Sequence, residues 1–93
     1  MANDIRLRTW VRGSDRDERS GLLGYVSVFY GDLILDGLTI RRTTEGRVTI
    51  SYPQRRDGRG HGHAIIRPID DDARLRIEKA ILGAAAAMQE AVE

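Results

Sequence analysis

Residues 47–69, RVTISYPQRRDGRGHGHAIIRPI, contain the features that decide how this chain folds. The stretch opens as a strand, because apolar and polar residues alternate from Val48 to Tyr52 with the period of two typical of a half-buried strand. Pro53 ends this strand, since proline cannot donate the next hydrogen bond of the ladder. Residues 54–63 follow with a glycine at every second position from 58 to 62, which predicts a flexible loop that carries arginines.

The first strand is expected at residues 4–12, where the side chains alternate in character. This alternation assigns one face to Ile5, Leu7, Thr9 and Val11 and the other to Arg6, Arg8, Trp10 and Arg12. Trp10 lies among arginines and could stack on a nucleic-acid base, but we interpret it as packing on a neighbouring strand. Residues 13–21 are charged and bounded by glycines, so they predict a solvated loop.

Two further strands lie between this loop and the opening stretch. Residues 22–30 are rich in Val, Phe and Tyr, and Gly31-Asp32 predicts a two-residue turn into residues 33–42. In the latter strand Ile34, Leu38 and Ile40 share one phase, and Asp36-Gly37 indicates a bulge. Hairpin follows hairpin, which predicts an antiparallel meander.

The last part of the chain, residues 70–92, predicts a long helix. Three aspartates at its start can cap the first turn, and their negative charge interacts favourably with the positive end of the helix dipole. The apolar stripe consists of Ile77, Ala80, Ile81, Ala84, Met88 and Ala91. The sequence therefore predicts one α+β domain over residues 1–93, with an antiparallel sheet of four or five strands at about residues 4–67 and the helix packed on it.

The composition is that of an ordinary globular protein. The chain has 93 residues, of which 41% are hydrophobic and 31% charged. It has no cysteine, so neither a disulfide framework nor a thiolate metal site is available. No apolar run is long enough to cross a bilayer and the first residues do not resemble a signal peptide, so we expect a cytoplasmic protein without a membrane partner.

Positive charge is concentrated in the middle of the chain. Residues 37–69 contain seven basic and two acidic residues, a net charge of +5, whereas the rest of the chain has a net charge of −4. Fourteen of the fifteen basic residues are arginine, whose planar guanidinium suits phosphates and base edges. This asymmetry indicates a polyanionic partner, although a solvated arginine face would have the same composition.

Several short motifs also occur in a recognisable order along the chain. They are Asp4-Ile5-Arg6-Leu7-Arg8, Pro53-Gln54-Arg55-Arg56, Asp57-Gly58, Ile65-Ile66-Arg67-Pro68-Ile69, Arg74 and Ile77-Glu78-Lys79-Ala80-Ile81-Leu82. In their order and spacing, more than in any single motif, they resemble the stage V sporulation protein G family of septation regulators. The resemblance covers about residues 4–82.

This resemblance implies a small dimeric protein that binds DNA and RNA and regulates gene expression. At the matching positions it implies nucleic-acid contacts by Arg55, Arg56 and Arg74. Arg67 stands where the family usually has histidine, and Gln54 replaces a small polar residue. With the loop arginine included, the candidate nucleic-acid-binding residues are Gln54, Arg55, Arg56, Arg59, Arg67 and Arg74.

We also expect a homodimer joined through the sheet. A chain of 93 residues buries little surface for its size, and exposed strand edges tend to pair with other strands. Such a dimer would set two arginine loops side by side.

Two other functions remain open from the sequence. One is a protein–protein adaptor whose helix or sheet edge docks a partner and whose arginines only solubilise it. The other is a metal-dependent hydrolase that uses His61 and His63 beside Asp57. Two histidines in a glycine loop lack the further ligands and the rigid frame of a metal site, so we expect no enzyme activity, catalytic residue, metal or cofactor.

Overall fold

The computed structural model describes residues 5–92 and the side chains of residues 5–88. Its elements in chain order are β1 (Ile5–Arg12), α1 (Asp15–Arg19), β2 (Leu22–Tyr30), β3 (Leu33–Arg42), β4 (Val48–Ser51), β5 (Gln54–Arg56), β6 (Gly62–Ala64) and α2 (Asp71–Val92). Strands β1 to β4 form one antiparallel sheet in sequence order, and β5 pairs with β6 in a separate hairpin. The predicted α+β meander with a C-terminal helix is confirmed; the predicted start at Asp4 lies outside the described residues.

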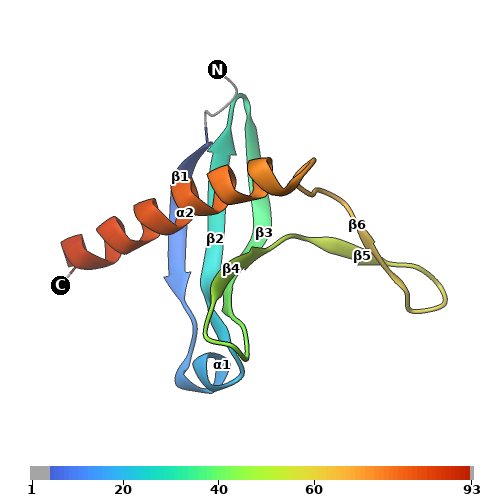
Figure 1. Ribbon diagram of the computed structural model, residues 1–93, viewed down its shortest axis with the longest axis horizontal. Helices are drawn as coiled ribbons and strands as arrows, with labels where there is room; N and C mark the ends of the chain where they lie inside the picture. Colours follow the sequence, from blue (N-terminus) through green and yellow to red (C-terminus); the bar gives the residue numbers. More distant parts are fainter. Residues whose placement is uncertain (1–4, 93) are drawn as a thin grey trace.

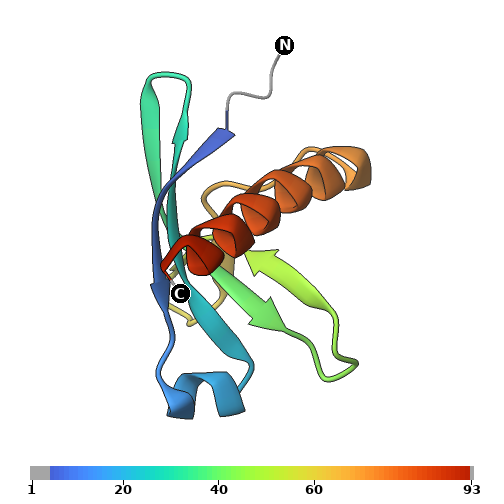
Figure 2. The same cartoon turned by 90° about the vertical axis from the view of Figure 1, so that its left-hand side faces the viewer.

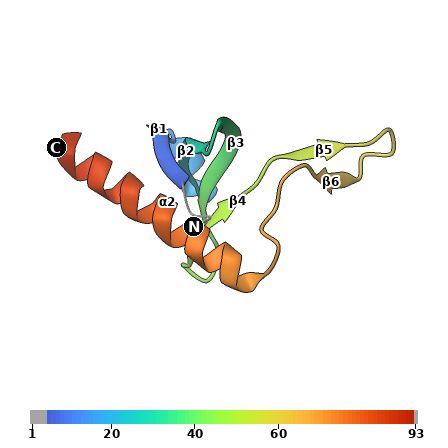
Figure 3. The same cartoon turned by 90° about the horizontal axis from the view of Figure 1, so that it is seen from above.

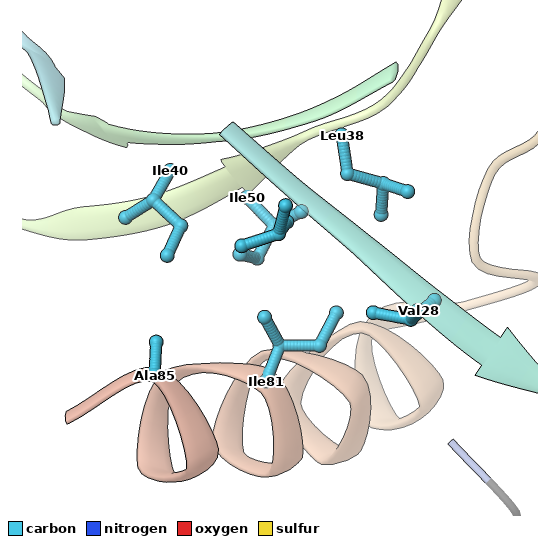
Figure 4. Packing of buried hydrophobic residues seen from close by; sticks show 7 residues of the cluster. Val28, Leu38, Ile40, Ile50, Ile81 and Ala85 are labelled. Atoms are coloured by element: carbon cyan, nitrogen blue, oxygen red, sulfur yellow. The ribbon is translucent and has the colours of Figure 1, made fainter. Parts of the chain in front are cut away.

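Helix α2 lies across one face of the sheet (Figures 1 and 2). The β5–β6 hairpin projects from the body away from the C-terminal end of that helix (Figures 1 and 3). The core forms where the helix crosses the sheet. Ile81 and Ala85 point toward Val28, Ile40 and Ile50, and all five side chains are buried (Figure 4). This burial of apolar surface holds the helix on the sheet.

The buried stripe of α2 differs from the prediction. Ile81 is buried as expected, but Ala80 and Met88 are exposed, and Ala85 takes the place expected for Ala84. The helix meets the sheet along positions four residues apart that include 77, 81 and 85, which form one row on a helix surface. The predicted member Ala91 lies outside the described side chains.

A β-bulge in β1 changes which residues face the core. Leu7 pairs with Val28 and Thr9 pairs with Ser27, so Arg8 is an extra residue between them. The alternation therefore shifts by one, and the expected face containing Val11 is wrong, because that side chain is 58% exposed.

Trp10 instead packs against the core together with Ile5 and Leu7. This confirms its interpretation as a packing residue. Its indole lies against Gly24 of β2, where a larger residue would collide with the ring.

The predicted loop at residues 13–21 contains a short helix, so that prediction was wrong. Ser14 caps α1: its Oγ accepts a hydrogen bond from the Asp17 backbone N–H at 3.1 Å, and the Asp17 carboxylate accepts one from the Ser14 N–H at 3.0 Å. This reciprocal capping box stabilises a single turn without any apolar residue. Arg12 also forms an ion pair with Glu18 at 2.9 Å.

The bulge predicted in β3 is confirmed, and it lies beside Pro53, from which the β5–β6 hairpin leaves the sheet. Val28 pairs with Leu35 and Val26 with Leu38, so Asp36 and Gly37 together oppose a single residue. Because of this bulge Leu35, not Ile34, packs against the core, and the expected phase of Ile34 was wrong. Gly37 has a φ of +85°, and a Cβ added to it would lie 3.3 Å from Pro53, where the chain leaves the sheet.

Candidate nucleic-acid interface

The segment expected as a flexible loop is a hairpin with regular pairing. Arg55 lies opposite His63 and Arg56 lies opposite Gly62. A further hydrogen bond from the Ile65 N–H to the Pro53 oxygen at 3.2 Å closes the root. Every residue from 54 to 65 is exposed, and the hairpin extends into solvent (Figures 1 and 3).

Asp57 organises the turn between β5 and β6. Its Oδ1 accepts hydrogen bonds from the backbone N–H groups of Arg59 at 2.8 Å and His61 at 3.0 Å. Its Oδ2 lies 2.8 Å from Nε2 of His63, which donates the third hydrogen bond. The His63 side chain, followed by the two backbone donors, lowers the pKa of Asp57 below its ordinary value. Gly60, with a φ of +82°, completes the turn where residues other than glycine are strained.

Three arginines among the predicted site residues lie on this hairpin with their side chains exposed. Arg55 and Arg56 line a shallow recess of about 440 Å³ together with Asp57 and His63. Arg56 also donates from Nη1 to the Gly60 oxygen at 3.0 Å, so it supports the turn. Arg59 is exposed in the turn itself. The hairpin therefore brings Arg55, Arg56 and Arg59 into one projecting segment.

Two other predicted residues meet at the root of the hairpin. Gln54 and Arg67 line a recess of about 520 Å³, which we call the root recess, and Arg41 of β3 lines the same recess. Arg41 was not among the candidate site residues. Its position could have been found from the sequence, because in the strand at 33–42 it has the opposite phase to the buried Leu38 and Ile40 and thus faces away from the core.

Arg74, the last predicted residue, has different surroundings. Its guanidinium pairs with Glu78 at 3.3 Å and with Asp71 at 3.6 Å, and its side chain is 32% exposed. It lines neither of the two recesses. The structure therefore does not bring Arg74 together with the other five residues. Its contact with nucleic acid stays an implication of the resemblance alone, whereas its ion pairs with Glu78 and Asp71 point to a role in stability.

Glu78, which forms an ion pair with Arg74, is a buried residue. It accepts hydrogen bonds from Thr49 Oγ1 at 2.6 Å and from the Ile50 N–H at 3.4 Å. These donors belong to β4, one of the two edge strands of the four-stranded sheet. Glu78 therefore links the helix to this edge strand and gives the buried Ile50 N–H an acceptor.

His61 and His63 are arranged around one carboxylate. His61 Nδ1 lies 3.8 Å from the Asp57 oxygen to which His63 is hydrogen-bonded. Within the described part of the chain, no group of three or more His, Cys, Asp or Glu side chains is placed to hold a metal ion. These contacts give both histidines a part in the turn.

Comparison with known proteins found no family model that matches the chain and no curated protein similar to it. The resemblance to the sporulation protein family therefore stays a prediction from the motifs. Among the described residues, none of the helices has the length and apolar character needed to span a membrane.

Proposed function

We propose that this chain binds DNA, RNA or both through the β5–β6 hairpin and acts in the cytoplasm as a small regulator of gene expression. The observation that carries the proposal is that the carboxylate of Asp57 is engaged in hydrogen bonds within the hairpin. Asp57 is the only acidic residue between positions 46 and 69. Its oxygens are occupied by the turn and by His63. Among the described residues, no carboxylate forms an ion pair with Arg55, Arg56 or Arg59, so their charge is available to a partner.

A polyanion is the partner that such a segment suits. Arginines on a projecting hairpin can approach phosphates from several directions, and each contact releases a condensed counterion. The planar guanidinium also forms paired hydrogen bonds with phosphate oxygens or a guanine edge. The family resemblance, which implies nucleic-acid binding at Arg55 and Arg56, agrees with this physical argument.

The test is the salt dependence of binding to a labelled random-sequence oligonucleotide, followed by fluorescence anisotropy. Three phosphate contacts predict a plot of log K against log salt concentration with a slope of about −2 to −3. Absence of binding at low salt, or binding independent of salt, would contradict the proposal.

The homodimer through the sheet remains part of the proposal. Among the described strands, β1 has a neighbour on one side only, and Val11 on it is 58% exposed. Leu33, Ile65 and Ile69 are also 60%, 60% and 90% exposed. Light scattering after gel filtration tests the dimer, and a monomeric mass at micromolar concentration would contradict it.

A further inference from the structure

The root recess lies at the base of the proposed nucleic-acid interface and has the size of a small ligand site. Its volume is about 520 Å³, within the range of about 300 to 1,000 Å³ that is usual for ligand pockets. Its walls come from β3, from the end of β4 through the first residue of β5, and from residues 64, 66 and 67. It therefore joins the main sheet to the hairpin.

The groups around the recess suit an anion that also carries hydrogen-bonding heteroatoms. Arg41 and Arg67 supply guanidinium donors, Gln54 supplies an amide, and Thr39 and Ser51 supply hydroxyls. None of the residues that line the recess is acidic. A nucleotide combines the phosphate that arginine binds with the base edges that arginine and glutamine read.

The rest of the recess can accommodate the face of a base. Pro53 and Ile66 add apolar surface beside the polar groups. Tyr52 also lines the recess, and its phenol is uncharged at neutral pH. A recess with cationic, amide and apolar walls matches both parts of a nucleotide.

We infer that the root recess holds one unpaired nucleotide of a DNA or RNA strand whose adjoining phosphates contact Arg55 and Arg56. Gln54 in the recess is followed directly by these two arginines, so the two recesses are adjacent along β5. In a duplex each base is stacked and paired and cannot enter such a recess, whereas a base in a single strand can be turned out and bound. This inference rests on the proposed function and adds a preference for single strands.

The experiment compares anisotropy titrations of a 12-nucleotide single strand and of its duplex at one salt concentration. The wild-type chain should bind the single strand at least about tenfold more tightly, as expected for one well-bound base. The variant Arg41→Ala/Arg67→Ala should lose most of this preference. The control Arg16→Ala/Arg19→Ala removes the same charge from exposed positions of α1 and should retain the preference.

A second variant changes the recess without changing charge. Ser51→Leu fills part of the space, and it should also lose the preference while circular dichroism shows an unchanged fold. Equal affinity for single strand and duplex in the wild-type chain, or equal loss of preference in the control, would overturn the inference but leave the proposed function standing. Absence of binding to every probe would overturn both. Adenosine or guanosine monophosphate that binds as tightly as the single strand would overturn the strand assignment and leave a free nucleotide as the ligand.

Discussion

Nε2 of His63 lies 2.8 Å from Oδ2 of Asp57, so a side chain of β6 is tied to the residue that begins the turn after β5. The same carboxylate accepts the backbone N–H groups of Arg59 and His61. One aspartate thus fixes the turn from both sides, and the three hydrogen bonds hold the hairpin arginines in place while the hairpin projects from the body.

The pH dependence of the hairpin follows from this arrangement. The pKa of Asp57 is lowered in the folded chain, first by His63 and then by the His61 and Arg59 amides. Because the pKa of Asp57 is lower in the folded chain than the ordinary carboxyl value of 3.8, the ionised carboxylate stabilises the turn fully at pH values above 3.8. This stabilisation is lost as the pH falls through the lowered pKa. In NMR spectra the Arg59 and His61 amide shifts should therefore titrate with a midpoint below 3.8. Asp57→Asn should abolish this titration, and a wild-type midpoint at or above the ordinary value would contradict the account.

Replacing Glu78 should destabilise the whole domain. Glu78→Ala leaves the Thr49 hydroxyl and the Ile50 N–H without their acceptor at a buried position. The free energy of unfolding should fall by about 2 to 3 kcal/mol, the usual cost of losing a buried, charged hydrogen-bond partner. Urea unfolding followed by circular dichroism measures this loss. The control Glu45→Ala, at an exposed turn position, should change stability by less than about 0.5 kcal/mol, and equal effects of the two substitutions would refute the role given to Glu78.

Arg74 is expected to affect stability more than binding. Arg74→Ala removes the guanidinium that pairs with the buried Glu78, so the free energy of unfolding should fall by about 1 kcal/mol. Arg76→Ala on the same helix, an exposed position with the same loss of charge, should cost less. Nucleic-acid affinity of folded Arg74→Ala should match that of Arg76→Ala. A specific loss of affinity in Arg74→Ala, without a loss of stability, would instead place this residue in the interface.

The sequence predicted the elements that depend on local signals. Alternation or a composition rich in Val, Phe and Tyr identified β1 to β4, whereas β5 and β6 lie in a segment that was expected to be a loop. Gly31-Asp32 identified the turn between β2 and β3, and the position of Asp36-Gly37 predicted the bulge. The aspartates predicted the start of α2, and Asp70 Oδ1 accepts a hydrogen bond from the Ala73 N–H at 2.8 Å. Each of these signals acts over a few residues, so it can be read without knowledge of the fold.

The structure differs from the sequence-based prediction where the exposure of a residue depends on contacts with distant parts of the chain. The bulge at Arg8 is defined only by pairing with β2, and it reverses the exposure expected for Val11. Which row of α2 side chains is buried depends on how the helix crosses the sheet. α1 is an exception, because its signal is local: Ser14 and Asp17 have the spacing of a capping box and could have been read from the sequence.

The candidate site shows the same division. Arg55, Arg56 and Arg59 are neighbours in sequence, so their gathering in one segment could be predicted. The meeting of Arg41, Gln54 and Arg67 requires the sheet and the hairpin root to be in place. Arg74 and Glu78 lie four residues apart on the helix, so their ion pair could have been predicted from the sequence. The burial of Glu78 against Thr49 and Ile50 of β4 could not, because it depends on how the helix packs on the sheet.

The most direct test of the central claim removes two hairpin arginine side chains that form none of the hydrogen bonds described for the turn. Arg55→Ala/Arg59→Ala leaves the Arg56 side-chain bond and the Arg59 backbone bond in place. Anisotropy titrations at several salt concentrations should show weaker binding and a slope of log K against log salt that is shallower by about 1.5, the value for two lost phosphate contacts. The control Arg16→Ala/Arg19→Ala, with the same change of net charge, should keep the wild-type slope. Identical slopes for the hairpin variant and the wild-type chain would contradict the claim that the hairpin binds nucleic acid.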